Sequence, residues 1–480
     1  MREQLVEVIR YLKSKKADYA DARFIRAQTE TIVVKNGKVE ALSRQEDAGF
    51  GIRVLVGGGW GFASSSKLSA GELKKTAHLA LEIARASGTV AREKVRLAPV
   101  EPYRDTFVTA VKKDPFLVSL DDKIDLLVSC CDILKKHPKI VVAEATMNFY
   151  DTEKIFVSSE GSLLEQKIIE SGAGYVATAV EEGNLQRRSY PNSHGGDFAT
   201  CGWEFIEAMD LLGNAERVRK EAVALLSAPD CPAGKKDVII NGSQVALQVH
   251  ESCGHPIELD RVLGTEISLA GGSFMTLDKL GKLRYGSGQV NIVADATTPG
   301  GLGTFGYDDE GVKAQRADIV REGLFVGYLT SRETAPIIGK TSNGTMRADG
   351  WNRIPLIRMT NINLLPGEWR LGDLIADTKE GLLIDTNKSW SIDDRRLNFQ
   401  FGCEAAWEIK EGKLGQLYRN PVYTGITPEF WNACDAVTNE KHWHFWGIPN
   451  CGKGEPIQTA HVAHGASPAR FRGVAVGATR

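Results

Sequence analysis

The first 90 residues show helical spacing of apolar positions, then strand-like alternation, then helical spacing again. Near the start, apolar side chains recur three and four residues apart, at Leu5, Val8, Ile9 and Leu12, which is the pattern of one buried helix face. The four residues 35–38 (Lys-Asn-Gly-Lys) separate two alternating segments and predict a tight hairpin turn. Ser69 and Glu72 have the spacing of a capping box and predict the start of a second helix. These signals predict an N-terminal α/β domain over residues 1–90.

Residues 116–227 follow the same order of elements, after a charged connection at 92–115 that contains prolines. The predicted elements are a helix through Ile124, Leu127 and Ile133, strands near 141–149, 155–159 and 175–179, and a helix that ends near Leu226. This pattern predicts a central α/β domain over residues 116–227. The similarity between the two blocks leaves open whether they are an internal repeat.

After Cys231 and Pro232 the chain becomes rich in hairpin signals. Residues 236–240 have the pattern of a short buried strand, and residues 245–249 that of a buried helix that follows a capping turn at Asn241. Further on, hairpins are predicted over Asp318–Thr330 and Gln400–Tyr418. We therefore predict a large, curved, mostly antiparallel sheet against which the helix packs.

Together these segments predict an α+β fold. An N-terminal α/β region of helices and strands precedes a large, mostly antiparallel, β-rich C-terminal domain over residues 232–480, which bears the helix of residues 245–249. The chain has 480 residues, of which 42% are apolar. That length is sufficient for two or three domains with sizeable cores.

The composition indicates a soluble intracellular enzyme. Lys and Arg number 59 against 61 Asp and Glu, for a formal net charge of −2, so there is no basic field to favour nucleic acid. No apolar run approaches the roughly 18 residues that span a bilayer, and the amphipathic start lacks a signal-peptide core. Eight cysteines in so long a chain indicate reduced thiols in the cytoplasm rather than a disulfide scaffold.

Two histidines and a carboxylate follow the predicted buried helix, in residues 250–255 (His-Glu-Ser-Cys-Gly-His). Polar groups at the end of an apolar helix are unfavourable unless they are paired or bind a metal. A regular helix would turn side chains five residues apart roughly 140° away from each other. A widened turn, which Gly254 favours, would bring His250 and His255 together. We predict that both bind one metal ion in a hydrolytic site, with Glu251 beside them; otherwise they are hydrogen-bonded residues at a helix end.

A catalytic zinc site usually has three protein ligands and an open position, so the third ligand must come from another segment. The C-terminal candidates are Cys451, His442, His444, His461 and His464. Cys451 is favoured because a thiolate is a strong zinc ligand and a glycine-flanked turn can approach the helix from outside. His442 and His444 remain rivals, although their His-Trp-His-Phe-Trp run is typical of one strand with an aromatic face.

Other motifs carry weaker signals. Arg358 and Asn361 are candidates for binding a peptide backbone or stabilising an oxyanion, but Arg358 is equally suited to a structural pair with an acid. Residues 301–306 (Gly-Leu-Gly-Thr-Phe-Gly) match a dinucleotide fingerprint. No helix follows them, and three carboxylates at 308–310 would repel a phosphate, so nucleotide binding is disfavoured.

Several motifs also occur together in one known family. They are the segment 250–255, Cys-Gly-Lys at 451–453, Arg-Met-Thr-Asn at 358–361, Leu-Pro-Gly at 365–367, Asp-Glu-Gly at 309–311, and the segments 51–66 and 470–477. With these motifs, which cover nearly the whole chain, the sequence resembles the TldD/PmbA family, also described as modulators of gyrase. Members that carry HExxxH resemble the TldD subunit, a zinc-dependent peptidase, whereas PmbA/TldE subunits lack the motif. The resemblance implies that His250, His255 and Cys451 bind Zn²⁺ and that Glu251 is the general base.

We therefore expect a cytoplasmic zinc peptidase that hydrolyses unfolded or small peptides. The expected partner is a second copy or a PmbA/TldE-like subunit, with no nucleic acid and no membrane. Two alternatives remain: a non-catalytic, metal-stabilised subunit or scaffold of a hetero-oligomeric protease, and a metal-dependent amidohydrolase of a non-peptide substrate. Glu251 weighs against the first, because a purely structural metal site has no use for an unliganded carboxylate.

Overall fold

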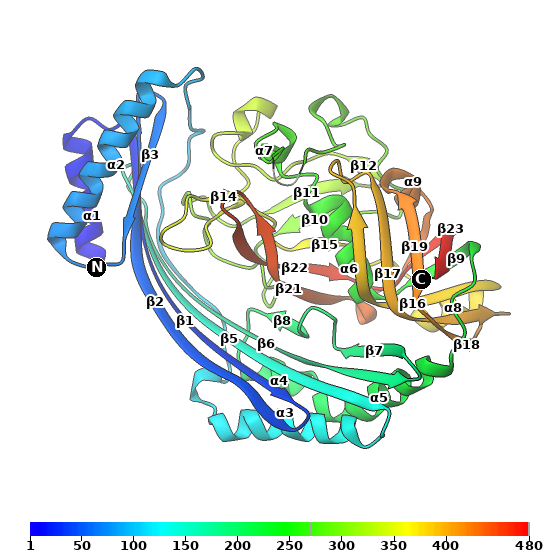
Figure 1. The fold of residues 1–480 in the computed structure, drawn as a ribbon. Coiled ribbons are helices and arrows are strands. Elements are labelled where there is room, and N and C mark those ends of the chain that lie inside the picture. Colours follow the sequence, from blue (N-terminus) through cyan, green and yellow to red (C-terminus); the bar gives the residue numbers. More distant parts are fainter. Residues whose placement is uncertain (269–270, 479–480) are drawn as a thin grey trace.

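Helices and mostly antiparallel sheets form the α+β fold that the sequence predicts. The computed structural model describes residues 1–268 and 271–478. A long, curved N-terminal sheet holds a β-rich C-terminal part against its concave side (Figure 1). Among the described residues, no helix is long and apolar enough to cross a membrane.

The N-terminal sheet has the strand order β3-β2-β1-β5-β6-β4, and β7 and β8 also pair with β6. Its strands are β1 (Tyr19–Lys35), β2 (Lys38–Val56), β3 (Gly59–Ser65), β4 (Arg104–Val108), β5 (Ile140–Ser158), β6 (Leu163–Glu181), β7 (Asn184–Tyr190) and β8 (Asp197–Ala199). The turn between β1 and β2 is the one predicted from residues 35–38. The central pair, β1 with β5, joins a strand from each of the two predicted N-terminal domains, so both contribute to one continuous sheet.

The strand β5 is longer than its sequence predicts. Two strands were expected, near 141–149 and 155–159, and this prediction is wrong because residues 150–154 continue a single strand. Those residues are half-buried on both faces, since they lie between two cores at opposite ends of the sheet. A strand stretch without one buried face shows no clear alternation and resembles a loop.

Helices cover the convex side of this sheet at both ends (Figure 1). At one end are α1 (Arg2–Ser14) and α2 (Ala70–Val90), and at the other are α3 (Leu120–Lys135), α4 (Trp203–Ala208) and α5 (Leu211–Ser227). The predicted capping box is present, because the Ser69 side chain accepts a hydrogen bond from Glu72 N at 3.3 Å. The helices leave the concave side free for the C-terminal part.

The largest C-terminal sheet closes on itself. Its order is β16-β9-β23-β19-β17-β18, and β16 also pairs with β17, so five of these strands form a ring. Its strands are β9 (Gly234–Ile240), β16 (Glu380–Ile392), β17 (Asn398–Lys410), β18 (Lys413–Arg419), β19 (Pro421–Ile426), β20 (Cys434–Val437) and β23 (Ala469–Ala478). All pairs are antiparallel except β9 with β16. This closed sheet carries the buried helix that follows β9.

Shorter elements surround the closed sheet. The strands are β10 (Ile292–Asp295), β11 (Arg316–Arg321), β12 (Leu324–Phe325), β13 (Met346–Arg347), β14 (Leu356–Ile357), β15 (Ile362–Leu364), β21 (His444–Lys453) and β22 (Gln458–Ala466). The α-helices are α6 (Gly242–Val249), α7 (Leu259–Val262), α8 (Leu371–Asp377) and α9 (Thr427–Asn432), and 3-10 turns occupy Leu277–Lys279, Ala335–Ile338 and Glu440–His442. In the N-terminal part, a 3-10 turn at Pro115–Leu117 precedes α3. The eight cysteines are all unpaired, as predicted.

Buried ion pairs join the two parts of the molecule. Asp309 accepts a hydrogen bond from Lys154 Nζ of β5 at 2.7 Å. Further along the interface, Arg188 of β7 contacts Glu404 at 3.2 Å and Asp385 at 2.7 Å. A buried charge is strongly destabilising when its partner is removed, so these pairs favour one arrangement of the C-terminal part on the sheet.

Candidate metal centre

The helix α6 carries the histidine motif and is anchored at its start. The Asn241 side chain accepts a hydrogen bond from Gly242 N at 2.9 Å and donates one to Asp385 of β16, also at 2.9 Å. All eight residues of α6 are buried. The cap and the burial together fix the direction in which the C-terminal end of the helix points.

The helix widens into a π-turn over His250–Gly254, as the sequence predicts. His255 N donates a hydrogen bond to His250 O at 3.1 Å, which is the i to i+5 bond of such a turn. The two imidazole rings meet edge to face, with their centroids 4.8 Å apart and an interplanar angle of 89°. The predicted convergence of His250 and His255 is confirmed.

A side chain at Gly254 would overlap with the side chain of Met359. A Cβ atom there would lie 2.2 Å from Sδ of the buried Met359. We expect Gly254→Ala to weaken metal binding and lower the melting temperature, since relieving the overlap costs about 1–3 kcal/mol. The matched control is Gly372→Ala, where a Cβ meets no atom within 4 Å. Metal titration and thermal unfolding measure both effects, and wild-type values for Gly254→Ala would show that the turn tolerates a methyl group.

Cys451 of β21 joins the two histidines. The ligand atoms of His250, His255 and Cys451 all lie within 4.8 Å of one another, and all three residues are buried. Cys451 Sγ is 3.7 Å from His255 Nε2. Nitrogen and sulfur ligands at about 2.1 and 2.3 Å from one tetrahedral zinc ion would be about 3.6 Å apart. The separation of Cys451 and His255 is close to this value, so the three side chains form a candidate metal site.

The protonation states of these side chains suit metal binding. Burial lowers the pKa of His250 to about 4 and holds the pKa of His255 well below its usual range, so both rings are neutral and have a free lone pair at neutral pH. Burial raises the pKa of the Cys451 thiol, but the contact with His255 and the positive charge of Arg358 outweigh this effect and leave the pKa lowered. A lowered thiol pKa favours the thiolate, which is the form that binds a metal.

Glu258 lies on the far side of the His255 ring. Its Oε2 is 3.1 Å from His255 Nδ1 and accepts a hydrogen bond from Arg261 Nε at 3.3 Å. Lys453 Nζ is 3.6 Å from the other carboxylate oxygen. A carboxylate at Nδ1 holds the ring proton there and leaves the Nε2 lone pair facing Cys451. The i to i+3 spacing of His255 and Glu258 is the sequence signal that could have revealed this contact.

Glu251, the predicted general base, is paired with an arginine. Arg396 Nη1 donates a hydrogen bond to Glu251 Oε2 at 2.6 Å. Arg396 lies in the connection between β16 and β17, where its carbonyl oxygen accepts a hydrogen bond from Thr427 Oγ1 at 3.1 Å. No local sequence signal pointed to Arg396, which is 145 residues away from Glu251 along the chain.

The other C-terminal histidines do not join the three candidate ligands. His442 Nε2 accepts a hydrogen bond from Leu371 N at 3.2 Å, and His444 contacts Asp197 of the N-terminal sheet. His461 contacts Glu170 of β6 at 2.6 Å. His464 lies on the opposite side of β22 from His461 and contacts His250. Among the candidates for the third ligand position, Cys451 is the residue whose ligand atom groups with those of His250 and His255.

The pair of His444 and Asp197 predicts a pH-dependent stability. Their Nε2 and Oδ2 atoms are 2.6 Å apart. Burial lowers the pKa of His444, but the hydrogen bond and charge of Asp197 outweigh it and leave the pKa raised. A raised folded-state pKa means that the pair stabilises the protein below the unfolded-state pKa of about 6.5 and loses this effect as the pH rises through the folded-state value.

We therefore expect His444→Ala to lower the melting temperature more at pH 6 than at pH 9. The difference corresponds to less than about 1 kcal/mol, because solvent screens a half-exposed ring. Equal losses for His444→Ala at pH 6 and pH 9 would show that the pair is not ionised.

Arg358 and Asn361, the predicted substrate-binding residues, are almost fully buried. Arg358 donates to the carbonyl oxygens of Gln458, at 2.9 Å, and Cys451. Asn361 Nδ2 donates to Asp295 O at 2.7 Å, and its Oδ1 accepts from Gly303 N at 2.8 Å. These contacts hold the β21–β22 hairpin and the loop at Gly303 in place, and substrate binding by either residue stays a prediction.

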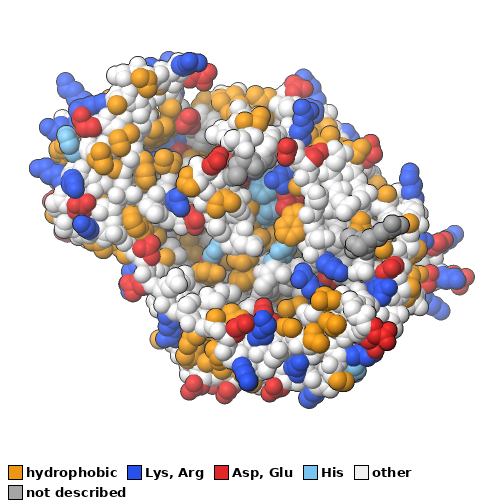
Figure 2. Space-filling model, in the orientation of Figure 1, with side chains coloured by type: hydrophobic (Ala, Val, Ile, Leu, Met, Phe, Trp, Pro, Cys, Tyr) orange, Lys and Arg blue, Asp and Glu red, His pale blue; other side chains and the backbone are white. Residues whose placement is uncertain are grey.

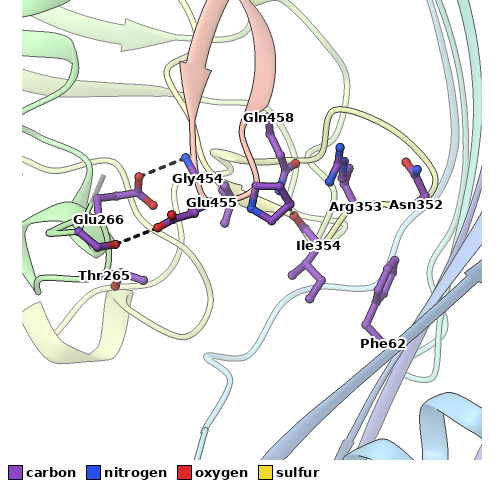
Figure 3. Close-up of a pocket in the computed structure, with 12 residues that line it drawn as sticks. Phe62, Thr265, Glu266, Asn352, Arg353, Ile354, Gly454, Glu455 and Gln458 are labelled. Atoms are coloured by element: carbon purple, nitrogen blue, oxygen red, sulfur yellow. Dashed lines mark hydrogen bonds between the residues drawn. The ribbon is translucent and has the colours of Figure 1, made fainter. Parts of the chain in front are cut away.

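A cavity of about 480 Å³ lies beside the hairpin that carries Cys451 (Figure 3). Phe62 of the N-terminal sheet lines one side, and Glu266, Gly454 and Glu455 line the other. Glu266 Oε2 accepts a hydrogen bond from Gly454 N at 3.1 Å. Figure 2 also shows a hollow in the middle of one face of the molecule, with histidine side chains visible inside it. Space for a ligand thus exists between the two parts, close to the hairpin.

Family models match the chain in three consecutive segments. They are the PmbA/TldD models described as PmbA/TldA metallopeptidase domain 1 at residues 20–84, the central domain at 113–226 and the C-terminal domain at 233–478. Together they cover most of the chain.

Whole-length comparisons agree with these models. A metalloprotease of Methanocaldococcus jannaschii is 32% identical over 453 residues, which is 94% of each chain. A zinc metalloprotease TldD homolog of Saccharolobus solfataricus is 23% identical, over 96% of this chain and 97% of the relative. The crystal structure of TldE from Thermococcus kodakarensis shares the fold, with a TM-score of 0.77 and 16% identity over 98% of this chain and 99% of TldE.

Proposed function

The chain belongs to the PmbA/TldD metallopeptidase family, and we propose that it is a zinc-dependent peptidase that hydrolyses unfolded or small peptides. One observation carries the proposal. The side chains of His250, His255 and Cys451 converge on one buried point, and the carboxylate of Glu251 lies on the same turn.

Zinc is the metal that these side chains favour. Two imidazole nitrogens and one thiolate are typical zinc ligands, and three protein ligands leave a fourth position open, as in catalytic sites. The name of the Saccharolobus relative supports the same ion. When bound, zinc lowers the pKa of a water molecule in the open position and polarises a carbonyl group.

Glu251 is the proposed general base. Its carboxylate takes a proton from the attacking water and later delivers it to the nitrogen of the leaving amine, so one residue serves both proton transfers. Arg396 orients this carboxylate through Oε2. The Glu251 carboxylate is only 7% exposed, so few bulk water molecules can form hydrogen bonds with it.

The subunit composition and compartment extend the proposal. We infer a cytoplasmic homodimer, or a heterodimer with a PmbA/TldE-like subunit, and the shared fold with TldE supports the second form. Because TldE shares the fold, the fold alone does not separate an active subunit from the alternative of a non-catalytic one. The intact Glu251 beside three candidate ligands supports the active form.

A cleavage assay tests the proposed function. Purified protein loaded with zinc is incubated with a peptide library derived from a digested proteome, and the products are identified by mass spectrometry. We expect new peptide termini with the zinc-loaded protein and few with the chelator-treated protein. Cleavage of non-peptide amides without cleavage of any peptide would favour the amidohydrolase alternative, and no turnover of either class would favour the non-catalytic subunit.

A further inference from the structure

His464 contacts a candidate metal ligand without belonging to the ligand group. It lies on β22 and is fully buried. Its ring meets that of His250 edge to face, with centroids 4.8 Å apart and an interplanar angle of 87°. His464 Nε2 is 2.7 Å from His250 Nδ1. Because the contact involves Nδ1 of His250, it restricts rotation of the His250 ring.

Contacts run from His250 through His464 to the backbone oxygen of Ile362, and the contact at Ile362 determines where the ring protons lie. His464 Nδ1 lies 3.0 Å from the backbone oxygen of Ile362, and a carbonyl oxygen can only accept a hydrogen bond. A neutral His464 therefore carries its proton on Nδ1 and its lone pair on Nε2. His250 Nδ1 must then donate to His464 Nε2, which leaves the lone pair of His250 on Nε2.

We propose that His464 is a positioning residue that fixes the tautomer and ring orientation of His250, so that Nε2 of His250 faces the zinc. This inference rests on the proposed zinc site. Glu258 holds the Nδ1 proton of His255 in the same way. The two ligand histidines thus have different partners, which are a carboxylate for His255 and a neutral imidazole for His250.

The neutral partner suits the charges around the site. The negative charge of Glu258 is compensated by Arg261 and Lys453, at 3.3 and 3.6 Å. A carboxylate in the place of His464 would add a further buried anion, which is unfavourable without its own cation. An imidazole accepts the same hydrogen bond without adding charge. His464 therefore fixes the orientation of His250 without adding a negative charge that would offset the positive charge of the zinc ion.

Two substitutions separate the hydrogen bond from the volume of the side chain. His464→Leu removes the acceptor for His250 and keeps an apolar group of similar size. His464→Gln retains a side-chain oxygen that can accept from His250 Nδ1 and an amide that can donate to Ile362. The matched control is His461→Leu, on the same strand, because His461 contacts Glu170 on the other side of β22.

The first readout is the zinc dissociation constant of the full-length protein, measured by competition with a chromophoric chelator. We expect His464→Leu to weaken zinc binding about 10- to 100-fold, which is the usual effect of removing a residue that hydrogen-bonds a metal ligand. His464→Gln should recover most of the affinity. His461→Leu should bind zinc like the wild type. The second readout is the absorption spectrum after cobalt substitution, in which His464→Leu should alter the d–d bands and keep the thiolate charge-transfer band.

Wild-type affinity and spectrum for His464→Leu would overturn the inference, and so would an equal loss in His464→Gln and His464→Leu, which would indicate packing alone. Absence of zinc binding by the wild type would instead overturn the proposed function. If His464→Leu does not fold, NMR of the cobalt-substituted wild-type protein tests the assigned tautomer of His250. We expect a hyperfine-shifted, slowly exchanging N–H proton from each ligand histidine, and absence of the His250 signal would contradict the assigned tautomer.

Discussion

Glu251→Gln is expected to retain zinc and to lower kcat/KM for peptide cleavage on the order of 10³-fold, within the range that general bases contribute. The amide keeps the size of the side chain and an oxygen that accepts from Arg396, so the turn and its ligands should stay in place. It lacks the basic carboxylate that takes a proton from the attacking water.

The measurement pairs zinc content with the rate of cleavage of one peptide identified from the library. Glu440→Gln, at an exposed position of the C-terminal part, is the matched control and should behave like the wild type. Cleavage by Glu251→Gln within a few-fold of the wild-type rate would remove Glu251 from the role of base. Loss of zinc from this variant would instead make Glu251 part of the metal site.

Cys451→Ser is expected to lower zinc affinity by at least about 100-fold and to reduce activity with it, because a neutral hydroxyl group replaces a thiolate ligand. The smaller side chain still fits the hairpin, so the fold should persist. His442→Ala and His444→Ala test the rival ligands, since both residues lie outside the group that the structure brings together.

Zinc stoichiometry is measured by metal analysis after dialysis against a weak chelator. Wild-type occupancy in Cys451→Ser together with metal loss in His442→Ala or His444→Ala would assign the third ligand to a histidine. Retained occupancy in His442→Ala and His444→Ala with depleted Cys451→Ser would support the site of two histidines and one cysteine.

Local signals predicted the features that depend on neighbouring residues. The turn at residues 35–38, the cap at Ser69 and the widened turn at His250–Gly254 are all present in the structure. Each depends on side chains within about five residues, where spacing alone carries the physical information. The convergence of His250 and His255 belongs to this group, because Gly254 lies between them.

Features that depend on distant segments were missed. Arg396 reaches Glu251 from the β16–β17 connection, and His464 reaches His250 across 214 residues. One isolated charged or polar residue forms no repeating pattern in the sequence, so the sequence does not indicate which distant residue it contacts. The closure of the C-terminal sheet was missed for the same reason, since pairing of β16 with both β9 and β17 is a tertiary contact. Cys451 was found through the resemblance to a family and the need for a third ligand.

The central claim is that one zinc ion is held by His250, His255 and Cys451, with a fourth position open. X-ray absorption at the zinc edge of the loaded wild-type protein tests it directly. We expect one sulfur neighbour at about 2.3 Å and two imidazole nitrogens at about 2.0–2.1 Å, with a light atom in the fourth position. A spectrum without sulfur, or with two or more sulfur neighbours, would contradict the claim.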